Sequence, residues 1–414
     1  MKKPELLAPV GDMERLKVAV HYGADAVYLG GKMFGMRSSP MNFTSEELRE
    51  AVEYCHEHKV KLYLTCNVLP RNNELDELPL FLENARDCGV DALIISDLGV
   101  LEYAKKYAPD VEIHISTQAG IVNYAAANAF CALGAKRIVT ARELSMGEIS
   151  ELRKNIPEDV DIECFVHGAM CVSFSGRCLI SNYLVGRDSN RGDCAQPCRW
   201  KYSLVEETRP NEYFPIAEEN GGTYIMNSKD MCMIEHIPEM IDAGITSFKI
   251  EGRAKSAYYV AVVTNAYRQA IDDYFENPSE NYRPKQWVLD EMRKVSYRDY
   301  CTGFYYGDPK DDAHISYEGG YKREWDVVAV VNSWSDGMLY CTQRNRFFKG
   351  DELEILERGK EPFTVKVEAI FNENGEEVES TNHAMMKFSF RLDREVEAES
   401  LIRKAKDIPA RVII

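Results

Sequence analysis

The chain has 414 residues, of which 45% are hydrophobic and 28% are charged, and this composition predicts an ordinary soluble globular protein of two or three domains. Its 50 basic and 67 acidic residues give a net charge of −17, which excludes general affinity for nucleic acid but leaves room for a local RNA site. The apolar run in MKKPELLAPVG is too short for a signal peptide, no uninterrupted apolar stretch is long enough to cross a membrane, and many unpaired-looking cysteines indicate a reducing cytoplasm.

One pattern recurs from the N-terminus to about residue 255. In GADAVYLGG, GVDALIISD, GAKRIVTARE and GITSFKIEGR, a glycine ends a helix, an apolar run follows, and polar residues come next. Glycine supplies the left-handed turn after a helix, and an all-apolar strand is typical of a parallel sheet covered on both faces. Further strands are predicted at Glu5–Ala8, Lys61–Cys66, Glu112–Ile115, Asp161–Val166 and Thr223–Met226.

Amphipathic helices are predicted between these strands. One spans Ser45–His58, with Thr44 and Ser45 as caps and Glu47 in its first turn. Eight or nine such strand–helix units predict an α/β fold, a (β/α)8 TIM-like barrel over residues 1–255. An open doubly wound sheet is the alternative, but no G-x-G-x-x-G follows the first strand.

A barrel places its chemistry at the carboxyl ends of its strands. The residues just beyond the predicted strands are polar: Asn67, Asp97, Ser116, Thr117, Gln118, Arg142, Glu143, His167, Asn227, Lys229, Asp230, Glu251 and Arg253. We expect a site for a small anion or a nucleobase, with His167, Glu143 and Glu251 as catalytic residues and Gln118 among the substrate-binding residues. Alternatively, several of these side chains cap the following helix or form structural ion pairs.

Residues 161–202 carry the most distinctive motif. Cys171, Cys178, Cys194 and Cys198 follow a C-x6-C-x15-C-x3-C spacing among small residues that let backbone amides approach sulfur. Neighbouring basic residues, among them Arg177, predict an anion-binding surface beside the thiols. The spacing favours a metal or iron–sulfur site over disulfides or plain packing, because no export signal marks secretion.

The same spacing bears on the metal. Structural zinc sites pair close ligands, and only Cys194 and Cys198 approach that arrangement, so thiolate ligands drawn from several loops favour a 4Fe–4S cluster. His167 begins HGAMC and is expected beside the first thiolate, where it transfers a proton or donates a hydrogen bond. The alternative is a histidine that fixes the loop through backbone hydrogen bonds.

The remaining chain divides into three parts. Residues 203–222 are acidic and turn-rich, which predicts a surface excursion, and residues 256–325 are predicted to form a helical extension and linker in which Asn277–Pro278 ends the first helix. From residue 326 to 414, short strands separated by turns predict a small antiparallel β-barrel. NRFFKGDELEIL within it resembles the second-domain barrel of translation elongation factors, which implies an RNA-facing role; a lid or a dimer contact are the alternatives.

HGAMCVSFSGRCLIS resembles the signature of the collagenase-like peptidases, peptidase family U32. The resemblance continues through PELLAPVGDMERLKVAVHYGADAVYLGG, STQAGIVN, NSKDM and FKIEGRAKSAYYV and so covers nearly the whole chain. Within the family, the chain is most similar to enzymes that hydroxylate uridine 34 of tRNA to 5-hydroxyuridine.

That resemblance implies a 4Fe–4S cluster held by Cys171, Cys178, Cys194 and Cys198, with Cys232 of NSKDMCM as the alternative fourth ligand. It also implies an oxygen-independent reaction linked to prephenate, a small dicarboxylate of the kind that arginines such as Arg142 and Arg253 clamp with two hydrogen bonds. The implied partners are the tRNA anticodon loop and a second subunit, either a further copy or a family paralogue.

Two other functions stay open. A U32-type peptidase is the family's historical description, but the chain has no H-E-x-x-H, no G-x-S-x-G and no evident Ser–His–Asp set. A non-catalytic iron–sulfur RNA-binding protein is the third hypothesis. Loss of activity with retained RNA binding, after replacement of Glu143 and Glu251, separates it from an enzyme.

Overall fold

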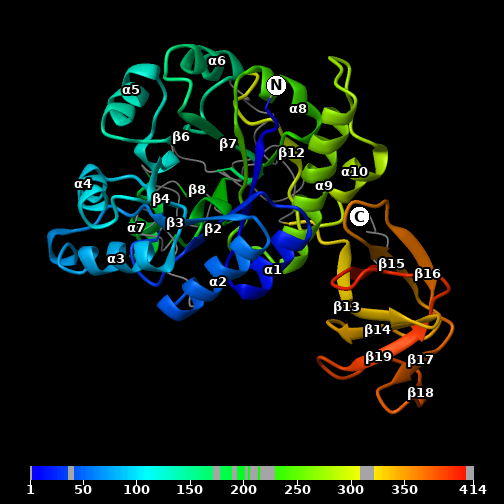
Figure 1. Cartoon of the computed structure of the whole chain (residues 1–414). Coiled ribbons are helices and arrows are strands. Elements are labelled where there is room, and N and C mark those ends of the chain that lie inside the picture. The colour runs from blue at the N-terminus through cyan, green and yellow to red at the C-terminus, as the bar shows by residue number, and fades with distance from the viewer. Residues whose placement is uncertain are drawn as a thin grey trace.

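The computed structural model describes residues 2–35, 42–170, 178–188, 194–200, 204–205, 213–214, 229–307 and 321–406. These residues form a barrel of strands ringed by helices, and beside it a smaller all-β part (Figure 1). No helix among them is long and apolar enough to cross a membrane.

Eight parallel strands make the barrel. They are β1 (Glu5–Pro9), β2 (Ala26–Gly30), β3 (Lys61–Cys66), β4 (Ala92–Ile95), β5 (Glu112–Ile115), β6 (Arg137–Val139), β7 (Asp161–Ala169) and β11 (Ser247–Ile250). Each strand pairs with the next, and β11 pairs with both β1 and β7, which closes the ring. The predicted (β/α)8 barrel is therefore confirmed.

Helices cover the outside of the ring (Figure 1). They are α1 (Met13–His21), α2 (Ser45–Glu57), α3 (Leu78–Cys88), α4 (Leu98–Tyr107), α5 (Tyr124–Ala132), α6 (Met146–Lys154), α8 (Ile237–Asp242) and α9 (Ala257–Glu276), with the short 3₁₀ turns η1 (Asn72–Glu74), η2 (Thr117–Ala119) and η5 (Ile234–His236). The predicted cap of α2 is confirmed: the Thr44 hydroxyl accepts from the Glu47 amide, and the Glu47 carboxylate accepts from the Thr44 amide.

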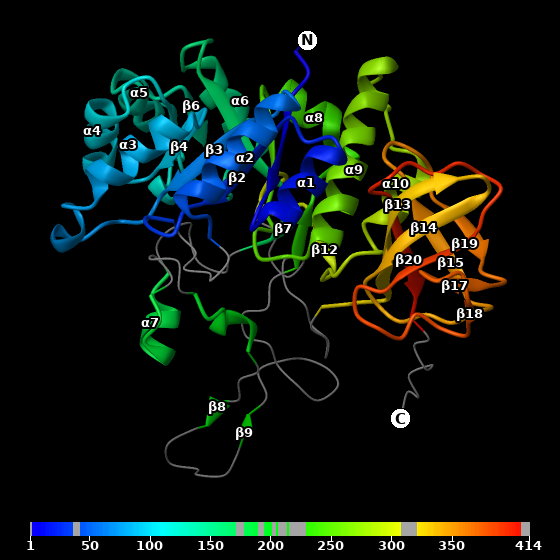
Figure 2. The ribbon, with the colours of Figure 1, turned by 60° about the horizontal axis from the view of Figure 1, so that its bottom comes forward.

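The strand β7 runs three residues beyond the predicted Val166. It continues because its end pairs antiparallel with β10 (Asp230–Cys232), which in turn pairs with β12 (Tyr300–Cys301). The intervening chain includes α7 (Ile180–Val185), η4 (Pro197–Arg199) and the paired strands β8 (Leu204–Val205) and β9 (Tyr213–Phe214), which project from this end of the barrel (Figure 2). The predicted strand at 223–226 lies outside the described residues.

The predicted helices after residue 256 are present. The first, α9, ends at its cap Asn277 and is followed by α10 (Gln286–Glu291). Tyr258, Tyr259 and Tyr267 are buried on α9 and so pack inward.

The C-terminal part is a curled antiparallel sheet that forms a half-barrel with its own apolar core. Its strands are β13 (Trp325–Ser335), β14 (Met338–Gln343), β15 (Glu352–Leu356), β16 (Phe363–Lys366), β17 (Ile370–Asn372), β18 (Glu377–Val378), β19 (Lys387–Arg391) and β20 (Leu401–Ala405). The predicted small antiparallel β-barrel is therefore confirmed as an antiparallel domain that curls into a half-barrel.

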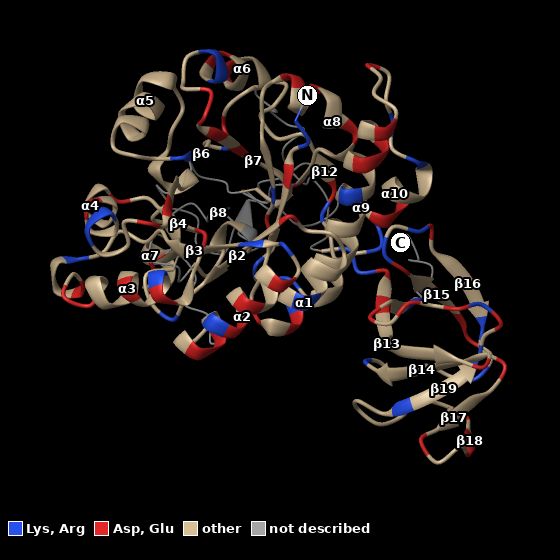
Figure 3. Cartoon of the chain, in the orientation of Figure 1, with Lys and Arg blue, Asp and Glu red and all other residues tan. Residues whose placement is uncertain are grey.

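Buried charges join this sheet to the barrel. Acidic and basic stretches meet where α9 and α10 face the sheet (Figure 3). Arg403 on β20 is fully buried and donates to Glu291 on α10 at 2.7 Å, and it also pairs with Glu354 on β15. The Tyr22 hydroxyl after α1 donates to the Leu356 carbonyl at 3.1 Å. Because buried charges need their partners, these contacts fix the sheet against the barrel.

Candidate active site at the barrel mouth

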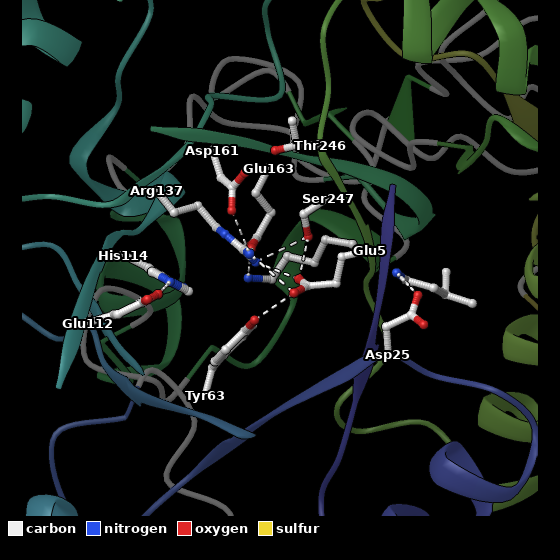
Figure 4. Close-up of polar contacts among 12 residues, drawn as sticks. Glu5, Asp25, Tyr63, Glu112, His114, Arg137, Asp161, Glu163, Thr246 and Ser247 are labelled. Carbon is white, nitrogen blue, oxygen red and sulfur yellow. Dashed lines mark hydrogen bonds and ion pairs between the residues drawn. The ribbon is translucent and has the colours of Figure 1, made fainter. Parts of the chain in front are cut away.

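A buried cluster of charged side chains fills the barrel at the amino-terminal ends of its strands, which we call the floor (Figure 4). Arg137 on β6 donates to Glu5 on β1 at 2.6 Å, to Glu163 on β7 at 3.0 Å and to Ser247 on β11 at 3.3 Å. Burial alone would raise the pKa of Glu5, but the charge and hydrogen bonds of Arg137 outweigh burial and lower this pKa to about 2. Glu5 and Arg137 therefore stay oppositely charged and tie the strands together from inside.

Above the floor, Lys249 on β11 extends this cluster, and we call Arg137, Glu163 and Lys249 together the charged column. Its ammonium lies 2.5 Å from a Glu163 carboxylate oxygen and 4.5 Å from the centre of the Tyr28 ring. Burial would raise the pKa of Glu163, but Lys249 and then Arg137 lower it. The interior is thus polar from the floor to the level of Tyr28, whereas barrel interiors are usually filled by branched apolar side chains.

The predicted residue Glu251 lies directly above this column. The Tyr28 hydroxyl lies 3.0 Å from the Ile250 carbonyl and 3.5 Å from a Glu251 carboxylate oxygen. The Tyr259 hydroxyl donates to the Glu251 carbonyl at 3.0 Å. These contacts hold the end of β11 from two sides. Glu251 is half-buried at the rim, by which we mean the residues that directly follow the carboxyl ends of the barrel strands.

Arg253, two residues further on, reaches across the rim to β3. Its guanidinium lies 3.3 Å from the Thr65 hydroxyl and 3.4 Å from the side-chain amide oxygen Oδ1 of Asn42, and Arg253 is only 8% exposed. A side-chain carbon on Gly30 would come within 2.5 Å of this guanidinium, so a larger residue there would displace the guanidinium from its present position. The arginine is therefore held rigidly over the ends of β2 and β3.

The other predicted rim residues follow β5 and β6. Arg142 is half-buried, with its guanidinium 3.8 Å from the centre of the Phe165 ring on β7, and Glu143 lies half-buried beside it. Gln118 lies in η2, and its backbone amide donates a hydrogen bond to the hydroxyl of the cap residue Ser116 at 3.3 Å. Arg142 and Glu143 follow β6 and Glu251 follows β11, so one strand, β7, lies between them.

Asn67 and Ser116 complete the polar rim. The Asn67 amide donates to the Ser116 hydroxyl at 3.3 Å, and the Ser96 hydroxyl donates to the Asn67 carbonyl at 3.2 Å. Asp97 caps α4 and Ser116 caps η2, as the alternative reading of these residues predicts. Ser116 thus caps η2 and also accepts a hydrogen bond from the rim residue Asn67.

His167 lies on the outer side of β7, against α9 and β12. Its ring centre is 5.6 Å from that of Tyr267 and 5.3 Å from that of Tyr300, and its Nδ1 lies 3.5 Å from the Tyr267 hydroxyl. Burial lowers the pKa of His167 to about 3, so the ring is neutral at physiological pH. A neutral, buried ring favours hydrogen bonding over proton uptake from solvent.

The cysteine segment leaves the barrel at the end of β7 and returns at β10. Asp230 pairs with Ala169 across these two strands, so both ends of the segment are joined at one point of the rim. A buried ion pair fixes β10, where the segment re-enters the barrel: Arg298 donates to the Asp230 carboxylate at 2.7 Å and 3.0 Å. The segment is therefore anchored beside the predicted active site.

Three of the four predicted cluster ligands lie in described residues. The Ala195 amide donates to the buried Ser181 hydroxyl at 3.0 Å, which joins the chain around Cys194 to the helix that follows Cys178. The Gln196 amide donates to the Cys194 sulfur at 3.3 Å, the kind of contact that stabilises a metal-bound thiolate.

Cys178 and Cys198 are half-buried and Cys194 is exposed. No group of three or more metal-binding side chains occurs among the described residues, while Cys171 and Arg177 lie outside them. The donor chemistry fits an iron–sulfur cluster, and the complete ligand set stays a prediction.

Cys232 occupies a different environment. It lies opposite His167 in the β7–β10 pairing, and its sulfur is 3.9 Å from the Tyr267 hydroxyl. Burial raises the pKa of its thiol to about 12. Cys232 therefore packs behind the rim with the tyrosines that surround His167.

Sequence reasoning missed the charged column of Arg137, Glu163 and Lys249. The signal was present: in KRIV, DIECF and SFKIE a charged residue interrupts an otherwise apolar strand. In a barrel covered by helices, such a residue must face the interior and find a partner of opposite charge.

Two sequence profiles match the chain. The one described as peptidase family U32 matches residues 11–315, and the one described as the peptidase family U32 C-terminal domain matches residues 323–403. The first covers most of the barrel and its rim, and the second covers the curled sheet.

Named relatives extend over similar lengths. The chain is 41% identical over 407 residues to "tRNA hydroxylation protein P1" of Bacillus subtilis, covering 98% of this chain and 96% of that protein. It is 34% identical to "tRNA hydroxylation protein P" of Escherichia coli, covering 86% of each. It is also 35% identical to a "Collagenase" of Porphyromonas gingivalis, covering 77% of this chain and 78% of that protein.

Proposed function

The chain belongs to peptidase family U32, and we propose that it is a tRNA-modifying enzyme that hydroxylates uridine 34 of the anticodon to 5-hydroxyuridine. The observation that carries the proposal is the nearly full-length similarity to the Bacillus subtilis protein named for tRNA hydroxylation. The polar rim supports it, because a barrel mouth lined by arginine, glutamate and amide groups suits a base and a small anion together.

In the proposed complex, the anticodon loop presents the wobble base to the barrel mouth. This base is single-stranded and enters a pocket without the cost of opening a duplex. Gln118 and Arg177 contact the substrate, since an amide and a guanidinium supply hydrogen bonds to the base edge and to phosphate. The net charge of −17 limits such binding to the local basic surface.

Arg253 and Arg142 bind the carboxylates of prephenate in the proposed site. The contacts of Arg253 with Thr65 and Asn42 hold its guanidinium in place before any ligand arrives, which reduces the entropy lost on binding. A guanidinium binds a carboxylate through two parallel hydrogen bonds that an ammonium does not reproduce.

Glu251 and Glu143 are the proposed proton-transfer groups. Both are half-buried beyond the ends of β11 and β6, two strands separated only by β7, where a carboxylate can reach a base bound over the mouth. His167, neutral and buried on the outer side of β7, acts in this proposal by orienting the start of the cysteine segment through hydrogen bonds rather than by accepting a proton from solvent.

Cys171, Cys178, Cys194 and Cys198 are the proposed ligands of a 4Fe–4S cluster. When bound, such a cluster supplies electron-transfer chemistry that amino-acid side chains lack. The chain's part is to hold the thiolates together through Ser181, to donate an amide hydrogen bond to Cys194, and to anchor the segment through Arg298 and Asp230. Oxygen independence is part of the same proposal.

A peptidase is the second candidate, favoured by the similarity to the protein named collagenase. A cysteine peptidase needs a thiol with a lowered pKa. In contrast, burial raises the pKa of Cys164 on β7 to about 12, which argues against this thiol as a nucleophile. Gelatin hydrolysis by the purified protein, abolished by Glu251→Gln or Glu143→Gln, would support this candidate.

Nucleoside mass spectrometry tests the proposed function. A bacterium that lacks tRNA hydroxylation is given this gene, its Glu251→Gln form or its Cys171→Ala form. The wild type is expected to restore 5-hydroxyuridine derivatives in bulk tRNA, and both variants are expected to fail although tRNA binding survives. If the Glu251 and Cys171 variants restore the modification as well as the wild type, the proposed site is wrong.

A further inference from the structure

A cavity lies on the face of the barrel opposite the mouth. Its volume is about 310 Å³, and residues that precede β1, β2 and β3 line it together with α9. Arg358, in the turn between β15 and β16, lines the cavity from the side of the C-terminal sheet. Small-molecule pockets begin at about this size, near 300 Å³. The cavity thus joins the two parts of the chain.

Positive charge prevails among its polar residues. Lys3, Lys59, Arg268 and Arg358 line the cavity, together with the carboxylates Asp25 and Asp272. Four cations facing two carboxylates leave an excess of two positive charges, in a chain whose net charge is −17. A compact dianion would neutralise this excess.

Arg268 on α9 is the buried member of the set. It is 8% exposed, and it pairs with Asp25 at 2.9 Å and with Asp272 at 2.5 Å. Its Nε nevertheless has no hydrogen-bond partner among the described residues. Since this nitrogen is itself covered, a ligand in the cavity would contact the exposed side chains of Lys59 and Arg358 rather than Nε.

The backbone is shaped around this arginine. A side-chain carbon on Gly23, whose φ is +97°, would come within 2.8 Å of the Arg268 Cγ, so glycine leaves the passage that Arg268 occupies. Lys59 has a φ of +62°, a conformation in which glycine is usual. A lysine held there at a conformational cost points to a use for its charge.

We propose that this cavity binds the phosphoryl group of a small molecule. Phosphate is close to a dianion at neutral pH, and its oxygens accept hydrogen bonds from lysine and arginine together. Because Arg358 belongs to the C-terminal sheet and the other cations to the barrel, the ligand would also hold the two parts together. The proposal is independent of the reaction at the mouth.

Calorimetry with inorganic phosphate as the probe tests this site on the full-length protein. Phosphate is expected to bind the wild type, and to bind Lys59→Gly and Arg358→Ala about tenfold more weakly or worse, since each loses a charge-assisted hydrogen bond. Lys59→Gly is chosen because glycine relieves the left-handed backbone, so weaker binding cannot be ascribed to a loss of folding. The matched control, Lys154→Ala, removes an exposed lysine of α6 outside the cavity and should bind phosphate as the wild type does.

Two results would overturn the proposal. One is phosphate binding that is absent in the wild type or unchanged in both cavity variants. The other concerns the source of the phosphoryl group: if tRNA displaces phosphate from the wild type and itself binds Lys59→Gly more weakly, the cavity takes an RNA backbone and not a small molecule. Phosphate binding that tRNA leaves intact supports the small-molecule site.

Discussion

Glu5→Gln removes one charge from the barrel floor and is expected to lower the free energy of unfolding by about 3 kcal/mol at pH 7. The magnitude follows from the pKa of Glu5, which falls from 4.5 to about 2 because Arg137 outweighs burial. Each pKa unit corresponds to about 1.4 kcal/mol of interaction between the carboxylate and its surroundings. Equilibrium unfolding in urea, followed by circular dichroism, measures the difference.

The pH dependence gives this prediction its sign. A carboxyl group whose pKa is lowered by folding contributes stability above its unfolded pKa and loses it as the pH falls towards the folded pKa. The difference between wild type and Glu5→Gln should therefore be constant from pH 8 to about pH 5 and shrink by about 1 kcal/mol by about pH 3.5.

The control for this experiment is Glu14→Gln. Glu14 forms an exposed ion pair with Arg344 at 3.5 Å, so its replacement should change the free energy of unfolding by less than about 1 kcal/mol. Equal effects of Glu5→Gln and Glu14→Gln at pH 7, or a Glu5 effect that does not change with pH, would refute the role assigned to the floor cluster.

Three further predictions follow from the rim, the cysteine segment and the domain interface. Arg253→Lys should raise the KM for prephenate about tenfold or more, because an ammonium cannot form two parallel hydrogen bonds; an unchanged KM in steady-state assays would remove Arg253 from the site. Cys198→Ser should lose iron and visible absorbance in anaerobically prepared protein while Cys232→Ser retains both, and the reverse result would make Cys232 the fourth ligand. Arg403→Ala should destabilise the protein by about 3–5 kcal/mol in urea unfolding, since it strands Glu291 in the interior, and a loss below about 1 kcal/mol would contradict this account.

The barrel was readable because local signals and tertiary structure agree in it. The strands β3 and β5 have the bounds that their apolar runs predict, and α2 begins at the predicted cap Thr44. The strands β10, β12 and β20 were not predicted. The first two are three and two residues long and exist through their pairing with each other and with the end of β7, which no local pattern encodes.

The candidate site was predicted in part. The rim residues follow from the rule that barrel chemistry lies at strand ends, and Glu251 and Arg253 do lie there. Strand position did not reveal that His167 faces outward, because a register shift in the β7–β11 pairing separates it from the inward-facing Phe165. The interior ion column escaped notice because a strand buried on both faces shows no alternation that marks its inner side.

The most direct test of the central claim is an anaerobic assay with purified, iron-loaded protein. The protein is mixed with prephenate and an anticodon stem-loop that carries either uridine or cytidine at position 34, and the digested RNA is examined by mass spectrometry. The account predicts 5-hydroxyuridine from the uridine substrate with the wild type, and none with Glu251→Gln or with cytidine at that position. An unmodified uridine substrate, with iron-loaded wild-type protein that binds it, would contradict the proposed reaction.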